Sequence, residues 1–407
     1  MTVATFIAPK PSAGPSRISC RCCGSGMMLS YLNLGKQPYA NTLQPIGAPL
    51  AEGAELRLFA CQRCQLSQLS HVAKRDTLYE SYAYRSGVSA GWRAHCAALA
   101  AEYGGAGKLT LDIASNDGTL VQAFVATGAS AMGLEPSLSF GDCEYPRITG
   151  WWGTDAARKL ELVGGQLDVI TAQNVLGHVH DVHDFMAGIA LALAPDGVAV
   201  IEVPYVADML RALSFDTVYH EHLSVWSVTA LRELCNAHKL TLSDVQPLAL
   251  HGGSIRAVIT RGTDVKPSVP TYLALERRDL NKSAYLKFSE RVSARIHDLS
   301  KTLHELGPYI GFGAAAKTTV MLHCLDVRAY PQVVFDDNEH KHGFEIAGTR
   351  VRIDGLPDLK PWHFETRPLV VFAWNWADAI IAKLRSAGYT GDIFVPTLEP
   401  YWDVVEP

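Results

Sequence analysis

The sequence predicts an α/β protein in which two separate strand–helix series follow a small cysteine-rich head. The first series runs from Leu109 to about Arg261, where short, continuous apolar runs alternate with amphipathic stretches. Such runs are typical of parallel strands that are buried on both faces, with helices between them. A second series begins after Leu306, and paired cysteines mark the head. We therefore expect three parts: residues 1–72, 73–265 and 266–407.

The individual elements follow from the same patterns. Strands are expected in the first series at 109–115, 131–135, 167–175 and 198–205, and in the second at 309–315, 332–338 and 369–375. Between the series, the charged stretch from Tyr272 to Leu306 is apolar at helical spacing, which predicts one or two long helices. Pro267 to Pro270 is the best candidate for a linker.

Composition excludes several classes of function. The chain has 407 residues, of which 48% are apolar and 19% charged, with a formal net charge of −5. These values are typical of a soluble globular protein and give no electrostatic footprint for nucleic acid or an anionic membrane. The beginning lacks the basic and apolar regions of a signal peptide, and the most apolar stretch, Ala187 to Val203, is broken by polar and turn residues. We expect a cytoplasmic protein that binds neither nucleic acid nor membrane.

Four of the nine cysteines form two CxxC pairs, Cys20 with Cys23 and Cys61 with Cys64. Each CxxC turn directs two thiolates at one ion, so the two pairs predict a tetrahedral zinc site. Four sulfur ligands leave no open coordination position, and the zinc is therefore expected to be structural. Cys22 is too close to Cys23 in the chain to serve beside it. A redox pair is the alternative interpretation.

The first series carries a candidate cofactor site. Its first strand ends in the turn Asp112 to Gly118, where backbone N–H groups can approach a ligand at the carboxyl end of the strand. The next strand ends at Glu135, an acidic position suited to the hydroxyl groups of a ribose. Asn174 and His178 follow a later strand at the same edge of the sheet. This order favours an adenosine-containing ligand, and at this point NAD(H) remains an alternative.

Four titratable residues in succession, Tyr219, His220, Glu221 and His222, follow the strand that ends at Tyr205. Histidine has an unperturbed pKa of about 6.5, so it can accept a proton near neutrality. A neighbouring phenol or carboxylate can fix the orientation of the ring. The set suits removal of a proton from a carbon beside a carbonyl group. Arg256, in the following strand, is a candidate ligand for a phosphate or carboxylate.

The second series repeats the pattern of a nucleotide site. Gly311, Gly313 and Ala316 fit a Rossmann fingerprint, and Asp336 and Asp337 end the next strand in the acidic position. A Walker loop is excluded because Ala316 replaces the glycine before the lysine. Close packing of a helix on a strand is the structural alternative. Two nucleotide-type folds predict two nucleotide-bearing ligands.

These motifs, taken together, resemble those of the sugar-nucleotide C-methyltransferases. The blocks that carry the resemblance are CRCCGS, LNLGKQPYANTL, CQRC, DIASNDG, AQNVLGHVHD, TVYHEHLSVWSVTAL, HGGSIR, GFGAAAKT, VVFDDN, HGFEIAGT and FAWNWAD, and they cover almost the whole chain. The resemblance implies a zinc-binding head, a class I methyltransferase core that uses S-adenosylmethionine, and a C-terminal Rossmann-like domain that helps to hold a sugar nucleotide. It also implies methylation at C3 of a 4-keto-deoxy sugar carried by dTDP, GDP or CDP.

The resemblance also assigns expected roles to residues. The catalytic set is His222 as general base with Tyr219, Glu221 and His178. The cofactor set is Asp112, Ala114, Asn116, Asp117, Glu135 and Asn174. The substrate set is Tyr79, Tyr82, Tyr84, Arg256, Lys317, Asp336, Asp337 and Asn338. Ala114 departs from the family pattern, which has glycine there, and Val225 and Trp226 replace the more usual Tyr-Phe.

Two alternatives stay open at the level of the sequence. One is a nicotinamide-dependent oxidoreductase that acts on a nucleotide sugar, and the other is a non-catalytic protein that senses such ligands. The identity of the nucleoside and of the sugar, the stereochemistry and the pathway are not fixed by the residues. A monomer and a homodimer are both compatible with them.

Overall fold

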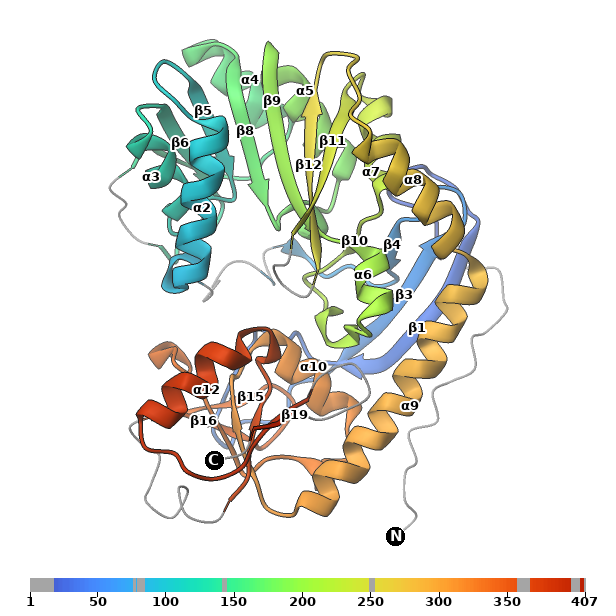
Figure 1. Cartoon of the computed structure of the whole chain (residues 1–407), viewed down its shortest axis with the longest axis vertical. Coiled ribbons are helices and arrows are strands. Elements are labelled where there is room, and N and C mark those ends of the chain that lie inside the picture. Colours follow the sequence, from blue (N-terminus) through green and yellow to red (C-terminus); the bar gives the residue numbers. More distant parts are fainter. Residues whose placement is uncertain are drawn as a thin grey trace.

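The structure, a computed structural model, describes residues 18–75, 78, 85–140, 145–248, 253–356, 367–396 and 403–405. Two α/β lobes lie one above the other, and a third, smaller sheet lies beside them (Figure 1). The predicted α/β class with two strand–helix series is confirmed. No helix in the described ranges is both long and apolar enough to cross a membrane.

The upper lobe in Figure 1 contains a seven-stranded sheet in the order β11-β12-β9-β8-β5-β6-β7. Its strands are β5 (Leu109–Ile113), β6 (Ser130–Glu135), β7 (Arg147–Thr149), β8 (Leu167–Gln173), β9 (Leu193–Pro204), β11 (Thr241–Leu248) and β12 (Ser254–Thr260). Strands β7, β6, β5, β8 and β9 are parallel, whereas β12 runs antiparallel to both of its neighbours. Parallel strands direct their carboxyl ends to one edge of the sheet, where ligands bind in open α/β folds.

Helices cover both faces of this sheet. They are α2 (Ala90–Tyr103), α3 (Thr119–Ala126), α4 (Thr154–Gly164), α5 (Val182–Ala192) and α7 (Val228–Ala237), whereas α6 (Val206–Arg211) follows the end of β9 and lies below the sheet in Figure 1. One apolar cluster joins α2 and α3 to the sheet through Leu99, Phe124 and Val200. A larger cluster joins α5 and α7 to the other face, and it continues into the small sheet. Burial on two faces explains why the strands are continuous apolar runs.

The lower lobe contains an eight-stranded sheet in the order β19-β18-β17-β13-β14-β16-β15-β2. Its strands from the C-terminal part of the chain are β13 (Ile310–Phe312), β14 (Val333–Phe335), β15 (Phe344–Ile346), β16 (Arg352–Asp354), β17 (Leu369–Val371), β18 (Ile393–Val395) and β19 (Asp403–Val405), and its helices are α10 (Ala316–Cys324) and α12 (Ala377–Ser386). The five strands from β18 to β16 are parallel. This sheet is the second predicted series.

The small sheet contains β1 (Met28–Gln37), β3 (Ala54–Cys61), β4 (Ser67–Leu69) and β10 (Ser224–Val225). The last strand comes from the upper lobe. In the opposite direction, β2 (Leu43–Pro45) leaves the head and pairs with β15 at the edge of the lower sheet. The three predicted parts are therefore interwoven, because the head contributes a strand to the lower sheet and receives a strand from the upper lobe.

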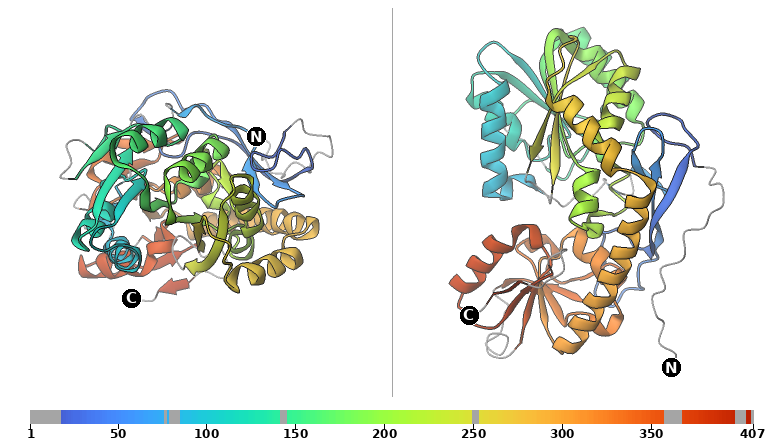
Figure 2. Two further views of the ribbon diagram at one scale, coloured as in Figure 1. Left: turned by 90° about the horizontal axis from the view of Figure 1, so that it is seen from above. Right: turned by 45° about the vertical axis from the view of Figure 1, so that its right-hand side comes forward.

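Two helices connect the lobes, α8 (Ser268–Asp279) and α9 (Lys282–Leu306), as expected for the charged stretch. Figure 2 shows α9 passing from the upper lobe to the lower one. The prediction of a linker at Pro267 to Pro270 is wrong: Pro267 precedes α8 and Pro270 lies in its first turn. Proline is compatible with the first turn of a helix, where the N–H groups have no partner within the helix.

Candidate active site

The four predicted zinc ligands meet in the head. Their sulfur atoms all lie within 4.8 Å of one another, with 3.5 Å between those of Cys20 and Cys64 and 3.6 Å between those of Cys23 and Cys61. Zinc–sulfur bonds of about 2.3 Å place tetrahedral sulfurs about 3.8 Å apart, so the cluster fits this ion. Cys22 is not one of the four, and its thiol donates to the carbonyl oxygen of Ala230 over 3.4 Å.

A single cavity of about 1450 Å³ extends between the two lobes and the head. The turns that follow β5, β6, β8 and β9 contribute to its wall, and so do the turns that follow β13, β14 and β17 of the lower lobe. Pockets for one small ligand are usually about 300–1,000 Å³. The volume therefore has room for two ligands that approach from opposite lobes.

The turn after β5 has an unusual backbone. Ala114, Asn116 and Gly118 have φ values of 55°, 52° and 79°, all in the left-handed region that costs most side chains energy. Gly118 cannot be replaced because a Cβ atom there would lie 1.9 Å from the ring of Tyr145. Asn116 can adopt this conformation because its short polar side chain forms local hydrogen bonds. The turn presents Ala114 and Asn116 to the cavity.

Two buried carboxylates lie behind and beside this turn. Asp112 accepts a hydrogen bond of 2.7 Å from the hydroxyl of Thr171, and burial raises its pKa to about 7, with Glu135 and Glu202 adding to the rise. Glu135 accepts from the backbone N–H of Asn116 at 2.8 Å and from that of Ser137 at 2.9 Å. A carboxylate has about four acceptor positions, so Glu135 can also accept from hydroxyl groups of a ligand.

Asp117 and Asn116 hold a neighbouring segment over the turn. The carboxylate of Asp117 accepts from the backbone N–H of Gly87 at 2.7 Å, and the amide oxygen of Asn116 accepts from the backbone N–H of Ser86 at 3.1 Å. Ser86 lines the cavity. Asp117 is not among the described residues that line the cavity. Its carboxylate instead positions the segment that contains Ser86 and Gly87. Asn174 lines the wall near by, with φ 58°.

The candidate base, His222, also lines the cavity. Its Nδ1 lies 2.7 Å from the carbonyl oxygen of Thr217. Because a carbonyl oxygen only accepts, Nδ1 carries the proton and the lone pair of the neutral ring is on Nε2. The ring centroid of Tyr219 lies 3.9 Å away, and that of His178 4.9 Å away at a right angle. Burial, reinforced by His222, lowers the pKa of His178 well below its usual value.

Glu221, the fourth member of the predicted catalytic set, lies behind this group. It is buried, and it accepts from the amide of Asn41 at 3.0 Å. Burial raises its pKa. Asn41 lines the cavity, whereas Glu221 is not among the described residues of its wall. The carboxylate thus joins the segment Tyr219–His222 to the zinc-binding head.

The lower lobe contributes a cationic and an amide-rich wall. Lys317 lines the cavity at the start of α10, where its ammonium group donates to Asn375 at 2.9 Å. Asp336 accepts from the backbone N–H of Ala314 at 2.7 Å and so closes the Gly/Ala-rich turn. Asp337 pairs with Lys383, and Asn338 also lines the cavity.

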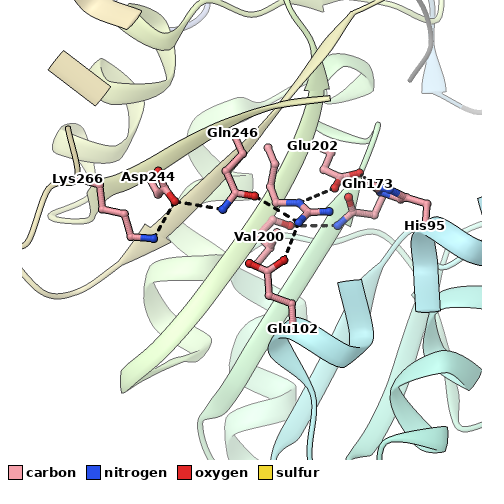
Figure 3. A network of polar contacts seen from close by, with 9 residues as sticks. His95, Glu102, Gln173, Val200, Glu202, Asp244, Gln246 and Lys266 are labelled. Carbon is pink, nitrogen blue, oxygen red and sulfur yellow. Dashed lines mark hydrogen bonds and ion pairs between the residues drawn. The ribbon is translucent and has the colours of Figure 1, made fainter. Parts of the chain in front are cut away.

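Arg256, like Asp117, is a predicted ligand residue that is not among the described residues of the cavity wall. Its guanidinium pairs with Glu202 at 2.8 Å and with Glu102 at 3.0 Å. Figure 3 shows these partners, with His95 bound to Glu202 on the far side. Among the described residues of the cavity wall Arg256 is absent. Its guanidinium instead balances the buried carboxylate of Glu202 in β9 and the partly exposed carboxylate of Glu102 in α2.

Three predicted residues, Tyr79, Tyr82 and Tyr84, lie outside the described residues. The structure also adds residues that the sequence patterns did not single out. Trp151 and Trp152 line the cavity after β7, and Asn41 reaches it from the head. Two adjacent tryptophans after a strand are a signal that was available in the sequence. The contribution of Asn41 depends on the interwoven head, so no local pattern indicates it.

The sheet order, the single antiparallel strand β12 and the ligand turn after β5 define a class I methyltransferase core. A family described as a methyltransferase domain matches residues 84–244, one described as a C-methyltransferase C-terminal domain matches 249–398, and one described as a "putative zinc binding domain" matches 20–79. The three matches follow the order of the three predicted parts, and the predicted resemblance to the C-methyltransferases is confirmed.

Individual proteins are also similar to the chain. The C-methyltransferase NovU of Streptomyces niveus is 29% identical over 406 residues, which is 94% of this chain and 96% of that one. Solved structures similar to part of the chain include magnesium protoporphyrin IX methyltransferase from Synechocystis, at 13% identity over 42% of this chain and 84% of the other, with a TM-score of 0.33. The YcgJ protein from Bacillus subtilis is 16% identical over 42% of this chain and 100% of its own, also with a TM-score of 0.33.

Proposed function

We propose that the protein uses S-adenosylmethionine to methylate the carbon beside the ketone, C3, of a 4-keto-deoxy sugar bound to dTDP, GDP or CDP. The observation that carries the proposal is the placement of His222. Its Nδ1 is held by a backbone carbonyl, and the ring lines a cavity shared by two nucleotide-type lobes. The family favours methyl transfer over hydride transfer or ligand sensing. We also propose that the cysteine cluster holds a structural zinc ion.

The upper lobe has the features needed for the methyl donor. The carboxylate of Glu135 suits the ribose hydroxyls, and Asp112 lies where the cationic amino acid part would lie along the turn. Ala114, Asn116 and Asn174 would contribute backbone and amide contacts from the same wall. S-adenosylmethionine, when bound, supplies an electrophilic methyl group on a sulfonium ion.

The lower lobe has features that suit the sugar nucleotide. The ammonium group of Lys317 can meet a phosphate, and Asn338 can bind hydroxyl or base groups. Asp336 and Asp337 shape this wall through the turn and the pair with Lys383. Substrate that is held by the lower lobe would present its sugar ring between the lobes, toward His222.

The chemistry follows from these positions. The substrate's ketone acidifies the neighbouring C–H bond, and Nε2 of His222 accepts that proton. The electrons of the bond form an enolate, whose oxygen needs a donor such as Tyr219 or His178. His178 is suited to a neutral role, because its lowered pKa keeps it uncharged near neutrality. Alignment of the enolate carbon with the donor then supplies much of the rate.

The test is the variant His222→Ala. Loss of general base catalysis is expected to lower kcat by at least about 100-fold, while thermal protection by S-adenosylmethionine is retained. His297→Ala, which removes an exposed histidine of α9, is the matched control and should keep full turnover. Near-normal turnover of the His222 variant, with both ligands bound, would show that another group is the base.

A further inference from the structure

A buried carboxylate beside the catalytic segment has no part in the chemistry above. Asp216 lies in the short helix η3 (Phe215–Thr217) of the upper lobe and is fully buried. Its Oδ2 accepts a hydrogen bond of 2.6 Å from the indole N–H of Trp374. Trp374 begins η8 (Trp374–Trp376) of the lower lobe. The bond therefore crosses from one lobe to the other, directly behind the cavity.

The partners of Asp216 form a charged cluster. The ammonium of Lys317 lies 4.1 Å from the ring centroid of Trp374. Burial raises the pKa of Asp216, and the charge of Lys317, the indole and the backbone N–H groups of Asp216 and Thr217 all oppose that rise. Trp374 itself packs against the apolar cores of both lobes. The bond from the indole N–H and the nearby ammonium charge favour one orientation of this buried carboxylate, with Oδ2 toward Trp374.

The same short helix holds the candidate base. Thr217, the residue after Asp216, provides the carbonyl oxygen that accepts from Nδ1 of His222 at 2.7 Å. The hydroxyl of Thr217 donates to the carbonyl of Ser214 at 2.6 Å, and the N–H of Val218 donates to the carbonyl of Phe215 at 3.1 Å. The turn is closed by its own bonds, so an anchor at Asp216 fixes the direction of the Thr217 carbonyl.

We propose that Asp216 is a positioning residue, which ties the lower lobe to the His222 segment through Trp374 and thereby keeps Nε2 of His222 as the basic nitrogen. The packing of the lower lobe on the upper lobe then also fixes the orientation of the His222 ring. The proposal rests on the proposed function of His222. It adds that the lower lobe, beyond any contact with the sugar nucleotide, is needed to set the tautomer of the base.

Two variants test this proposal. Asp216→Asn removes the negative charge and turns one carboxylate oxygen into an amide donor. Trp374→Phe removes the indole N–H together with one ring of the indole, and it keeps an aromatic ring for packing. The matched control is Glu345→Gln. Glu345 is also a buried carboxylate, and it also joins two parts of the chain through its bond of 2.8 Å with Gln44. It lies at the edge of the lower sheet and away from the His222 segment.

The first readout needs no substrate. In protein labelled with ¹⁵N-histidine, the two ring nitrogens of His222, assigned with a His222→Gln variant, report the tautomer. We expect a protonated Nδ1 in the parent and in Glu345→Gln, and a mixture of tautomers in both test variants. An unchanged tautomer in both test variants would overturn the proposal.

The second readout is turnover. With dTDP-, GDP- and CDP-linked 4-keto-6-deoxy sugars, kcat of the test variants should fall about 10- to 100-fold, part of the contribution of a general base, with KM nearly unchanged. Exchange of the C3 proton in D₂O, with S-adenosylhomocysteine present, should fall in parallel. Equal losses in Glu345→Gln would show a merely structural role and overturn the proposal. If the parent is inactive on all three sugars but the tautomer changes as expected, the positioning role stands and the proposed function fails.

Discussion

At the scale of single residues, Ala114 shows a local conflict between residue and backbone. Its φ of 55° favours glycine, and an L-residue in this region costs about 1–2 kcal/mol. We predict that Ala114→Gly raises the free energy of unfolding by about 1 kcal/mol, because the relief of strain exceeds the added entropy of the unfolded chain. Urea unfolding measures the change.

The matched control for this prediction is Ala387→Gly. Ala387 is exposed and has an ordinary φ of −79° at the end of α12. Glycine there only adds freedom to the unfolded chain and should lower stability by about 0.5–1 kcal/mol. A decrease in both variants would contradict the inference of strain at position 114.

We predict that Asp112 makes binding of the proposed methyl donor depend on pH. Its pKa in the free protein is about 7 because the group is buried near two other carboxylates. A cationic ligand favours the charged carboxylate, so binding should lower this pKa and release a proton. Affinity is then expected to fall as pH decreases from 7 to 5, by up to about tenfold per pH unit.

Calorimetry in two buffers of different ionisation enthalpy measures the released protons directly. At pH 6 we expect close to one proton per bound S-adenosylmethionine, and fewer at pH 8. Asp112→Asn should remove the pH dependence and bind more weakly at pH 8. The same proton release in the variant would assign it to another group.

The candidate site could be predicted in part at this scale. The motifs alone placed Asp112 and Glu135 near the ends of strands and His222 beyond one. The structure brings all three to one cavity, and their roles remain predictions. Arg256 has the same pattern of a charged residue near a strand, yet its guanidinium pairs with two carboxylates, of which Glu202 is buried. Only tertiary contacts distinguish the two situations, because a local pattern does not reveal what a side chain faces.

At the scale of elements, the long strands could be predicted and the exchanged strands could not. Strands β5, β8 and β9 are apolar runs buried on both faces, which is a strong local signal. Strands β2 and β10 have three and two residues, too few for any periodicity. Their pairing depends on partners far away in the chain, β15 and β4.

The short pairing of β10 with β4 links the proposed zinc site to the segment that contains His222. Ser224 pairs with Gln68, and the hydroxyl of Ser227 donates to the carbonyl oxygen of Cys64 at 3.1 Å. We predict that Cys23→Ser loses zinc, lowers the unfolding temperature by at least about 5 °C and reduces turnover. The neighbouring Cys22→Ala variant, which changes a thiol outside the four-sulfur cluster, should keep one zinc per chain. Zinc content by mass spectrometry decides between the two cysteines.

At the scale of the whole molecule, the cavity has one wall from each lobe, with His222 between them. Separate walls predict separate effects on the two ligands. Glu135→Gln should weaken S-adenosylmethionine binding by about 10- to 100-fold, the cost of losing charge-assisted hydrogen bonds, with little effect on the sugar nucleotide. Lys317→Met should weaken the sugar nucleotide by a similar factor and leave the methyl donor almost unchanged.

Calorimetric titration of each variant with S-adenosylhomocysteine and with dTDP, GDP and CDP measures the four affinities without turnover. S-adenosylhomocysteine shares the ribose that Glu135 is proposed to bind, and the diphosphates carry the group proposed for Lys317. Because each variant serves as the control for the other, a general loss of folding would lower both affinities together. Weaker binding of both ligands by both variants would mean that the lobes do not divide the cavity, whereas opposite selective losses would assign one ligand to each lobe.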